Sequence, residues 1–312
     1  MATEPAIAIL NTRPVGARPV RAARRHGTFA DYWALTKPEV SFLILLTTFA
    51  GFYLASAAES GGFPALRVIY TLAGTLLVAG GTGALNQFLE RSFDAWMRRT
   101  ARRPVASGRV RPLHALRFGL ALSLTGALLL ALAVNILASL LAVATLLSYL
   151  FIYTPLKRKT PLCTLAGAFP GAVPPLIGWA AARGQLNAGA WALYAVVFVW
   201  QFPHFMAIAW MYREDYTRAG YRVLPAGKWR ERILNWQSAA SSLVLIPVSL
   251  IPAIAGRSSL AHCAGVSLAG WIFLWYSVRF AYSKSNTAAR QLLAASIIYL
   301  PVVFVLFMLE RP

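Results

Sequence analysis

The sequence predicts an all-α polytopic membrane protein with nine transmembrane helices, and three observations support this fold class. Hydrophobic residues make up 58% of the 312 residues and charged residues only 13%, which leaves too few polar side chains to cover a water-soluble surface. The mean hydropathy is +0.58. Uncharged intervals recur along the chain at about the 20 residues that a helix needs to cross a bilayer.

Charged residues and helix-breaking residues mark where the predicted spans begin and end. The third and fourth spans share one uncharged stretch, residues 118–156, which is too long for a single helix and is broken near Asn135. Pro174 and Pro175 break the fifth span, and Pro203 is expected to kink the sixth. The nine predicted spans are Val40–Ala58, Val68–Leu89, Phe118–Val134, Leu137–Tyr153, Leu162–Ala181, Ala188–Met211, Ile233–Ile254, Leu260–Val278 and Gln291–Met308.

The basic residues are distributed unevenly across these spans. A net charge of +20 alone would suggest a nucleic-acid partner or an anionic surface. However, 26 of the 30 Lys and Arg residues fall on one side of the predicted membrane. This bias places the N-terminus in the cytoplasm, and because the charges flank helices, no nucleic-acid partner is expected. We expect a multi-pass protein of the cell (inner) membrane, with the mitochondrial inner membrane as the alternative.

The sequence divides into an N-terminal tail and a transmembrane domain. Residues 1–31 are expected to form a cytoplasmic, disordered tail, and residues 32–309 form the transmembrane domain. Because the tail is rich in arginine, a short transit peptide is the alternative interpretation. Cys163 and Cys263 are isolated in the sequence, so neither a disulfide framework nor a thiolate metal site is indicated.

The chain has only ten acidic residues, so their positions are informative. Asn86, Glu90 and Asp94 stand at i, i+4 and i+8 near the end of the second span, which places them on one helical face. Carboxylates at this spacing repel one another unless a cation bridges them. One amide and two carboxylates suit Mg²⁺. The alternative is a solvated helix end at the membrane interface.

Basic residues follow this first acid cluster. Guanidinium groups beside a carboxylate-bound Mg²⁺ form a receptor for a diphosphate. A second basic run follows the fourth span and is able to close around the same anion. Flanks that only fix the membrane orientation are the alternative for both groups. The residues are Arg98, Arg99, Arg102 and Arg103, and then Lys157, Arg158 and Lys159.

A second acid cluster, Glu214 and Asp215, follows the sixth span on the same side of the membrane. Acids after spans two and six imply a duplicated four-helix unit, giving two four-helix repeats around a central cavity plus one extra helix. His204 lies within the sixth span, next to Pro203. It is interpreted either as one partner of an interhelical hydrogen bond or as a ligand or orienting group for a buried substrate.

Residues 86–104 resemble the first aspartate-rich motif of the UbiA-type intramembrane prenyltransferases, in the form of the branch that farnesylates protohaem IX. The motif is Asn86-x3-Glu90-x3-Asp94-x2-Met97-x-Arg99-Thr100-x2-Arg103-Pro104. The resemblance covers about residues 32 to 308. Further matching segments are Leu35-Thr36-Lys37-Pro38, Tyr153-Thr154-x2-Lys157-Arg158-x-Thr160-Pro161, residues 174–179, Trp200-Gln201-x-Pro203-His204-Phe205, and Arg213-x-Asp215-Tyr216-x2-Ala219-Gly220.

This resemblance implies transfer of a farnesyl group from farnesyl diphosphate to a vinyl group of haem b. Water addition then gives the hydroxyethylfarnesyl group of haem O, a precursor of haem A for terminal oxidases, so a downstream haem A synthase is an expected partner. Haem b is a substrate and Mg²⁺ the cofactor. The implied Mg²⁺ ligands are Asn86, Glu90, Asp94 and, opposite them, Asp215. The implied diphosphate ligands are Arg99, Arg103, Lys157 and Arg158, and His204 is the candidate haem ligand.

The sequence departs from the family pattern at two positions. The second motif commonly has two aspartates four residues apart, but Ala219 stands four residues after Asp215. The ligands for a second metal ion are therefore incomplete. Cys163 occupies a position where many members have Asn.

Two other functions remain open at this point. A prenyltransferase acting on hydroxybenzoate or a quinone precursor would share the Asn86-to-Asp94 motif and differ around His204. A transporter would also use duplicated bundles and broken helices. Against a transporter, the acids cluster at the ends of spans and not at mid-depth.

Overall fold

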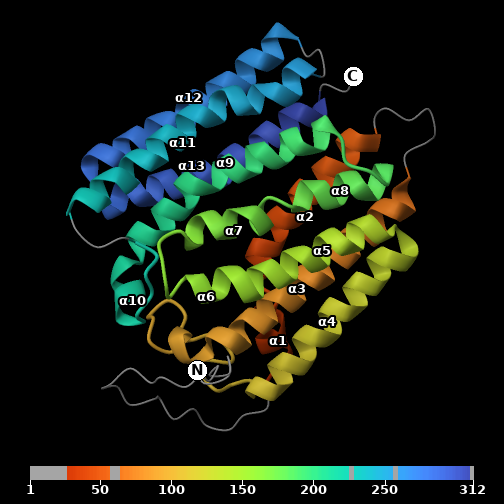
Figure 1. Cartoon of the computed structure of the whole chain (residues 1–312), viewed down its shortest axis with the longest axis vertical. Coiled ribbons are helices and arrows are strands. Elements are labelled where there is room, and N and C mark those ends of the chain that lie inside the picture. Colours follow the sequence, from red (N-terminus) through yellow and green to blue (C-terminus); the bar gives the residue numbers. More distant parts are fainter. Residues whose placement is uncertain (1–26, 57–63, 225–227, 256–258, 310–312) are drawn as a thin grey trace, which may run out of the picture.

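The computed structural model describes residues 27–56, 64–224, 228–255 and 259–309, and every regular element within these ranges is helical (Figure 1). Most of the predicted tail lies outside these ranges, and the first helix begins at Phe29. The elements are α1 Phe29–Leu35, α2 Pro38–Ser56, α3 Ala65–Asp94, α4 Pro112–Ala133, α5 Ile136–Ser148, η2 Tyr149–Tyr153, α6 Thr154–Leu156, α7 Cys163–Gly171, α8 Pro174–Arg183, α9 Ala188–Met211, α10 Arg213–Arg218, α11 Lys228–Ala255, α12 Leu260–Ser283 and α13 Asn286–Leu309.

Eight stretches within the described ranges are long and apolar enough to cross a membrane, which confirms the all-α membrane fold class. They include Ile136–Leu156, which joins α5, η2 and α6, and Cys163–Arg183, which joins α7 and α8. The predicted span Ile233–Ile254 falls within α11, of which the structure describes the side chains of the apolar part Trp236–Pro252. The predicted total of nine spans and the two four-helix repeats therefore stay predictions.

The predicted helix breaks occur where the sequence placed them. Asn135 separates α4 from α5, and its side-chain oxygen accepts a hydrogen bond from the Ala138 N–H as the N-cap of α5. The same side chain donates to the Ala180 carbonyl of α8 at 2.8 Å. Two residues, including Ala172, separate α7 from α8, which begins with the Pro174-Pro175 pair. In contrast, α9 continues as a helix through Pro203.

Helices α3 and α4 pack closely because glycines face each other across them. A Cβ atom at Gly81 would lie 2.7 Å from the Gly119 carbonyl oxygen, and one at Gly126 would lie 2.7 Å from that of Gly74. The two pairs run antiparallel, seven residues apart on each helix. Without a strong hydrophobic force between helices in lipid, such small residues permit the backbone contact that holds them together. This contact fixes α3, which carries the first acid cluster.

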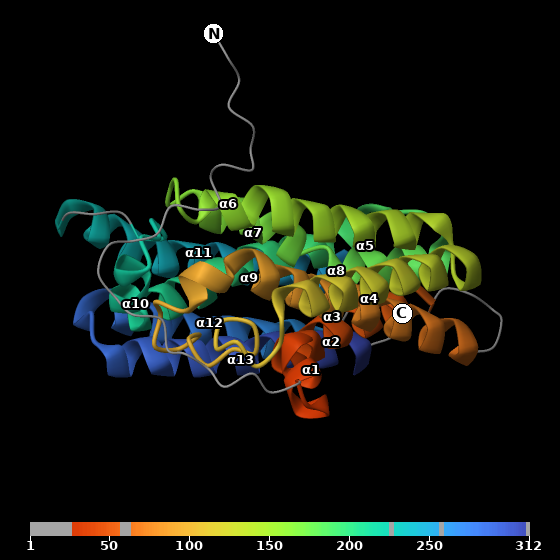
Figure 2. The same cartoon turned by 90° about the horizontal axis from the view of Figure 1, so that it is seen from below.

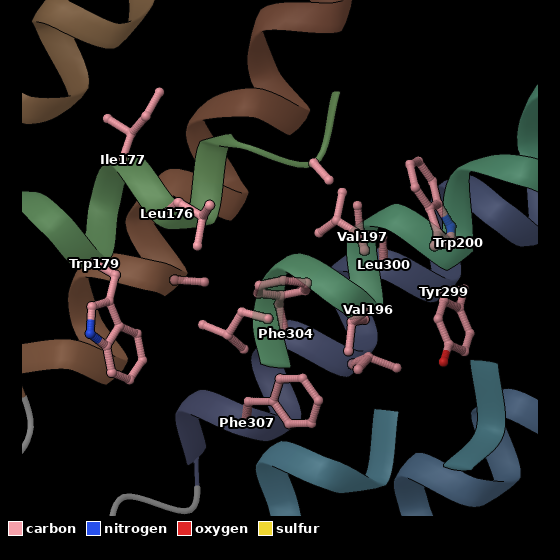
Figure 3. Close-up of a cluster of buried hydrophobic side chains, with 14 of the residues drawn as sticks. Leu176, Ile177, Trp179, Val196, Val197, Trp200, Tyr299, Leu300, Phe304 and Phe307 are labelled. Carbon is pink, nitrogen blue, oxygen red and sulfur yellow. The ribbon is translucent and has the colours of Figure 1, made fainter. Parts of the chain in front are cut away.

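The buried apolar core lies between α8, α9 and α13, as Figure 3 shows. In Figure 2, α5, α6 and α7 follow one edge of the molecule and α12 and α13 the other, while α9 runs between them. The labelled core side chains are Leu176, Ile177, Trp179, Val196, Val197, Trp200, Tyr299, Leu300, Phe304 and Phe307.

Basic residues gather at one end of the bundle, which we call the basic end. It carries α1, the loop of residues 95–111, the end of α6, and α10 (Figure 1). Among the described residues, Arg67 in the first turn of α3 and Arg183 at the end of α8 lie at the opposite end. The Lys and Arg residues are therefore distributed unevenly between the two ends of the helices, as the sequence predicts.

Candidate active site

The last turns of α3 bury the first acid cluster at the basic end. Asn86 is 1% exposed, Glu90 5% and Asp94 0%. Because α3 continues unbroken to Asp94, the three side chains share one helical face, as predicted. Buried carboxylates are costly unless they are paired and hydrogen-bonded. Their partners therefore define the site.

Glu90 is held by groups from three other positions in the chain. The Lys157 ammonium lies 3.0 and 3.1 Å from its two oxygens. The Tyr221 hydroxyl donates to it at 2.9 Å, and the Asn86 amide nitrogen also donates at 2.9 Å. Burial alone would lower the pKa of Lys157, but the Glu90 carboxylate keeps that pKa well above its usual value. Lys157 is therefore a permanent cation at this site.

Asp94 is paired with one arginine. Nη1 of Arg103 donates to both carboxylate oxygens, at 2.8 and 2.9 Å. The loop that carries Arg103 is tied to α3 because the Thr100 hydroxyl donates to the Asp94 main-chain carbonyl at 3.0 Å. The side chain of Asp94 is almost fully buried, whereas Arg103 is partly exposed.

Asn86 contacts a cation that the spacing analysis did not single out. The Lys37 ammonium donates to the Asn86 side-chain oxygen at 2.6 Å. Lys37 has a φ of 51° in the turn between α1 and α2, and Gln87 donates to the Ala34 carbonyl beside that turn. Burial lowers the pKa of Lys37 to about 7, and repulsion from Arg103 and Lys157 adds to this effect. The surroundings of Lys37 thus lack sufficient negative charge.

A turn of π-helix at η2 places two tyrosine rings beside Lys157. The Lys157 nitrogen lies 4.5 Å from the Tyr153 ring centre and 5.9 Å from that of Tyr149. The Thr154 hydroxyl donates to the Tyr149 carbonyl at 2.9 Å and lies 3.4 Å from the Asn86 amide nitrogen. Single π-turns often occur at functional sites. Here the turn joins the aromatic rings to the first acid cluster.

The second acid cluster has different partners. Asp215 accepts hydrogen bonds from the Arg99 main-chain N–H and from Arg218, each at 3.1 Å. The Arg99 guanidinium stacks over Tyr212 at 4.2 Å. Glu214 is exposed. Asp215 therefore anchors the loop that carries Arg99 and Arg103 to α10.

The segment of residues 219–224, which follows α10, covers the first acid cluster. Besides the contact of Tyr221 with Glu90, the Arg222 N–H donates to the Lys157 carbonyl at 2.8 Å. Burial, together with the Glu90 carboxylate, raises the pKa of Tyr221, so that its hydroxyl remains a donor. Phe93 packs against Tyr221 with ring centres 5.6 Å apart.

The structure brings together most of the predicted site residues. Asn86, Glu90 and Lys157 form one hydrogen-bonded group, Asp94 pairs with Arg103 at the end of the same helix, and the Arg158 guanidinium lies 4.6 Å from the Phe93 ring centre. Arg99 and Asp215 contact each other, and within the part of the chain that the structure describes no hydrogen bond joins their side chains to the first acid cluster. In the described ranges, no group of three or more His, Cys, Asp or Glu residues is placed to hold a metal ion.

Lys37, Thr154 and Tyr221 complete the group, and spacing arguments missed them. Lys37 lies 49 residues from Asn86 in sequence, and Tyr221 lies 131 residues from Glu90. Lys37 had a signal, because it belongs to the Leu35-to-Pro38 segment that matches the family pattern. Tyr221 had no signal in the sequence.

His204 lies in α9, away from these contacts. Its Nδ1 atom lies 2.8 Å from the Ser296 hydroxyl of α13, and its ring stacks on Trp200 at 4.8 Å. The predicted interhelical hydrogen bond is therefore present.

Residues 44–300 match the family described as the UbiA prenyltransferase family. A relative from Solibacter usitatus (strain Ellin6076), named protoheme IX farnesyltransferase, is 46% identical over 288 residues, covering 90% of this chain and 99% of the relative.

Two solved structures share the fold. One, from work on digeranylgeranylglyceryl phosphate synthase, has a TM-score of 0.72 at 17% identity, covering 90% of this chain and 98% of the other. A UbiA homologue from Archaeoglobus fulgidus bound to DMAPP and Mg²⁺ has a TM-score of 0.61 at 12% identity, covering 90% of this chain and 100% of the other.

Proposed function

Since the chain belongs to the UbiA prenyltransferase family, we propose that it transfers a farnesyl group from farnesyl diphosphate to a vinyl group of protohaem IX, giving haem O. The enzyme class follows from the family, and the substrates follow from the names of relatives such as that from Solibacter usitatus. The proposal also explains the chemistry of the buried group at the end of α3.

The charge balance of this group is the observation that carries the proposal. Lys37, Arg103 and Lys157 face only two carboxylates, Glu90 and Asp94. The buried group thus has one basic residue more than it has acidic ones, and Lys37, whose pKa is lowered to about 7 chiefly by burial, donates to an amide oxygen and not to a carboxylate. A bound diphosphate supplies the missing negative charge and accepts hydrogen bonds from all three bases.

The donor set also fits Mg²⁺. Asn86, Glu90 and Asp94 offer only oxygen ligands on one buried helical face, and Mg²⁺ uses one or two carboxylates together with substrate phosphate. We assign these residues as its ligands, with Asp215 as a further candidate from α10. Bound there, Mg²⁺ neutralises charge on the diphosphate. The Archaeoglobus fulgidus homologue, bound to DMAPP and Mg²⁺, supports the use of Mg²⁺.

The basic residues promote departure of the diphosphate. The bond between farnesyl C1 and the diphosphate oxygen breaks, and its electron pair leaves with the diphosphate. Lys157, Arg103 and Lys37 stabilise that charge, with Arg99 and Arg158 farther along the basic end. Tyr153 and Tyr149 offer ring faces to the allylic cation, and Phe88, Phe202 and Phe205 are further candidates from the sequence.

The vinyl group of haem completes the reaction. Its π electrons form the new carbon–carbon bond to C1, and water adds to the remaining carbon cation and loses a proton. Exclusion of water before this attack prevents simple hydrolysis of the allylic cation. The segment of residues 219–224, whose Tyr221 contacts Glu90, helps to keep water out of the site. His204 is the proposed contact for the haem iron.

The membrane setting suits both substrates, because haem and a C15 chain are largely apolar. We place the basic end in the cytoplasm and the protein in the cell inner membrane, on the distribution of Lys and Arg. A haem A synthase that consumes the product is the proposed downstream partner.

The proposal is tested by incubating membranes that contain the protein with protohaem IX and farnesyl diphosphate. The extracted haem should gain the mass of a farnesyl and a hydroxyl group. Parallel incubation with hydroxybenzoate in place of haem tests the alternative aromatic prenyltransferase. Unchanged haem together with prenylated hydroxybenzoate would refute the haem assignment.

A further inference from the structure

His204 and Ser296 form a polar contact within an apolar part of the bundle. The two residues lie on α9 and α13, and the His204 Nδ1 atom is 2.8 Å from the Ser296 hydroxyl oxygen. Ser296 is fully buried. The Trp200 indole donates to the Ser296 main-chain carbonyl at 2.9 Å, so Trp200 joins the same two helices.

The hydrogen bonds of Ser296 determine which nitrogen of His204 carries the proton. The Ser296 hydroxyl donates to the Leu293 carbonyl at 2.6 Å, and a carbonyl oxygen only accepts. A hydroxyl has one hydrogen, so while it donates to Leu293 it accepts in its bond with His204. In that arrangement His204 Nδ1 is the donor, and in the neutral ring Nε2 is left with a free lone pair.

Nothing in the described ranges uses that lone pair. The contacts of His204 there are the Nδ1 bond to Ser296 and the ring contacts with Trp200 and Phe205. Trp200 stacks on the imidazole at 4.8 Å and 26°, which restricts rotation of the ring. The imidazole is thus oriented by its environment, and its second nitrogen has no hydrogen-bond partner among the described residues.

We propose that Ser296 is a positioning residue that holds His204 in the Nδ1–H tautomer, so that Nε2 binds the iron of the haem substrate. The proposal rests on the proposed function, because it takes haem as the substrate. Partners that bond the second nitrogen of a ligand histidine fix its tautomer and raise its basicity. Ser296 would act on the iron only through His204.

The competing arrangement has the Ser296 hydroxyl turned away from Leu293. The hydroxyl would then donate to Nδ1, and the proton of His204 would reside on Nε2. That tautomer has no lone pair at Nε2 for a metal. The two arrangements therefore predict opposite protonation of the same ring.

The first experiment uses the full chain without haem, labelled with ¹⁵N-histidine. The chain has only four histidines, and the His204→Gln variant identifies the signals of His204. We expect a protonated Nδ1 and an unprotonated Nε2 in the wild type, and a mixture of tautomers in Ser296→Ala. Protonated Nε2 in the wild type would overturn the proposal.

The second experiment titrates the same variants with protohaem IX and follows the Soret band. We expect an imidazole-ligated spectrum that is lost in His204→Gln. Ser296→Ala should bind haem about 10- to 100-fold more weakly, in the range found for partners of metal ligands, and Ser296→Thr, which keeps a hydroxyl, should restore affinity. The matched control is Ser277→Ala, which removes a buried hydroxyl pair with Ser242 between α11 and α12.

The two experiments separate the possible failures. A haem product with a Soret band indifferent to His204 would overturn iron ligation while leaving farnesyl transfer intact. An equal loss of haem affinity in Ser277→Ala and Ser296→Ala would assign Ser296 a general packing role and overturn its positioning role.

Discussion

The first and second acid clusters lie at the same end of the molecule but have different partners. Glu90 and Asp94 are buried, and each is paired with a basic side chain, Glu90 with Lys157 and Asp94 with Arg103. Asp215 is also buried, but its two donors are a main-chain N–H and an arginine three residues away.

This difference suggests two roles: the first acid cluster belongs to the proposed diphosphate site, and Asp215 anchors a loop. In the proposed function, the bases of the first acid cluster turn from the carboxylates to the bound diphosphate. Asp215 holds the start of the loop that supplies Arg103. Similar motifs at the ends of two helices therefore do different work, and substitutions should affect them to different degrees.

The largest effect is expected from Lys157→Met. This change leaves Glu90 buried without its cation, which costs about 3–5 kcal/mol of folding free energy, and it removes a diphosphate ligand. Thermal unfolding in detergent measures the loss. The double variant Lys157→Met/Glu90→Gln should regain much of the stability but no activity. Lys159→Met, an exposed neighbour, is the control, and equal losses for Lys157 and Lys159 would contradict the pairing.

Asp94→Asn should nearly abolish farnesyl transfer. The neutral amide is a poor Mg²⁺ ligand and no longer pairs with Arg103, so we expect a fall in kcat of about 10²–10³-fold, the size found for preorganised charge-stabilising groups. Haem product formed per minute is the measurement. Asp31→Asn, another acid paired with an arginine at this end, should remain active. Near-normal turnover by Asp94→Asn would remove Asp94 from the site.

Asp215→Asn should have a smaller effect than Asp94→Asn. An amide oxygen still accepts from the Arg99 N–H, so the loop keeps its anchor, and we expect about a tenfold fall in activity, or about 1.4 kcal/mol in the barrier. Glu214→Gln, its exposed neighbour, should be silent. A loss as large as that of Asp94→Asn would support Asp215 as the further Mg²⁺ ligand and would contradict a role limited to anchoring the loop.

The smallest effect is expected at the Asp31–Arg109 pair, 2.7 Å apart beside α1. The hydrogen bond from Arg109 holds the pKa of Asp31 below its usual value. A lowered folded-state pKa gives stability that is present at neutral pH and is lost as the pH falls through it. Asp31→Asn should therefore lower stability by about 0.2–1 kcal/mol at pH 7. The difference from wild type should vanish well below pH 4; a difference that persists there would show that the ion pair is not its source.

Much of the fold was predictable because lipid imposes a strong pattern on sequence. Apolar length located eight spans, and Asn135 and Pro174 marked real breaks, since each acts through local geometry. α9 remains helical through Pro203, and the kink expected there stays a prediction. The seventh predicted span falls within α11, and that it crosses the membrane stays a prediction.

The site was predictable only along one helix. The i, i+4, i+8 spacing of Asn86, Glu90 and Asp94 is a local property, so the sequence contains it. Lys37 and Tyr221 reach these residues through tertiary packing, across 49 and 131 residues of chain. The spacing of residues along a helix does not predict such contacts. The sequence also did not show which of the neighbouring basic residues contact the buried acids. The structure was needed to separate them from the basic residues that are exposed.

The most direct test of the buried charge cluster is the metal dependence of the complete reaction. Purified protein is supplied with protohaem IX and farnesyl diphosphate, and the farnesylated haem and released diphosphate are measured together. EDTA should stop formation of both products, and excess Mg²⁺ should restore both in equal amounts in the wild type but not in Asp94→Asn. Full turnover in the presence of EDTA would contradict the assignment of Asn86, Glu90 and Asp94 as the Mg²⁺ and diphosphate site.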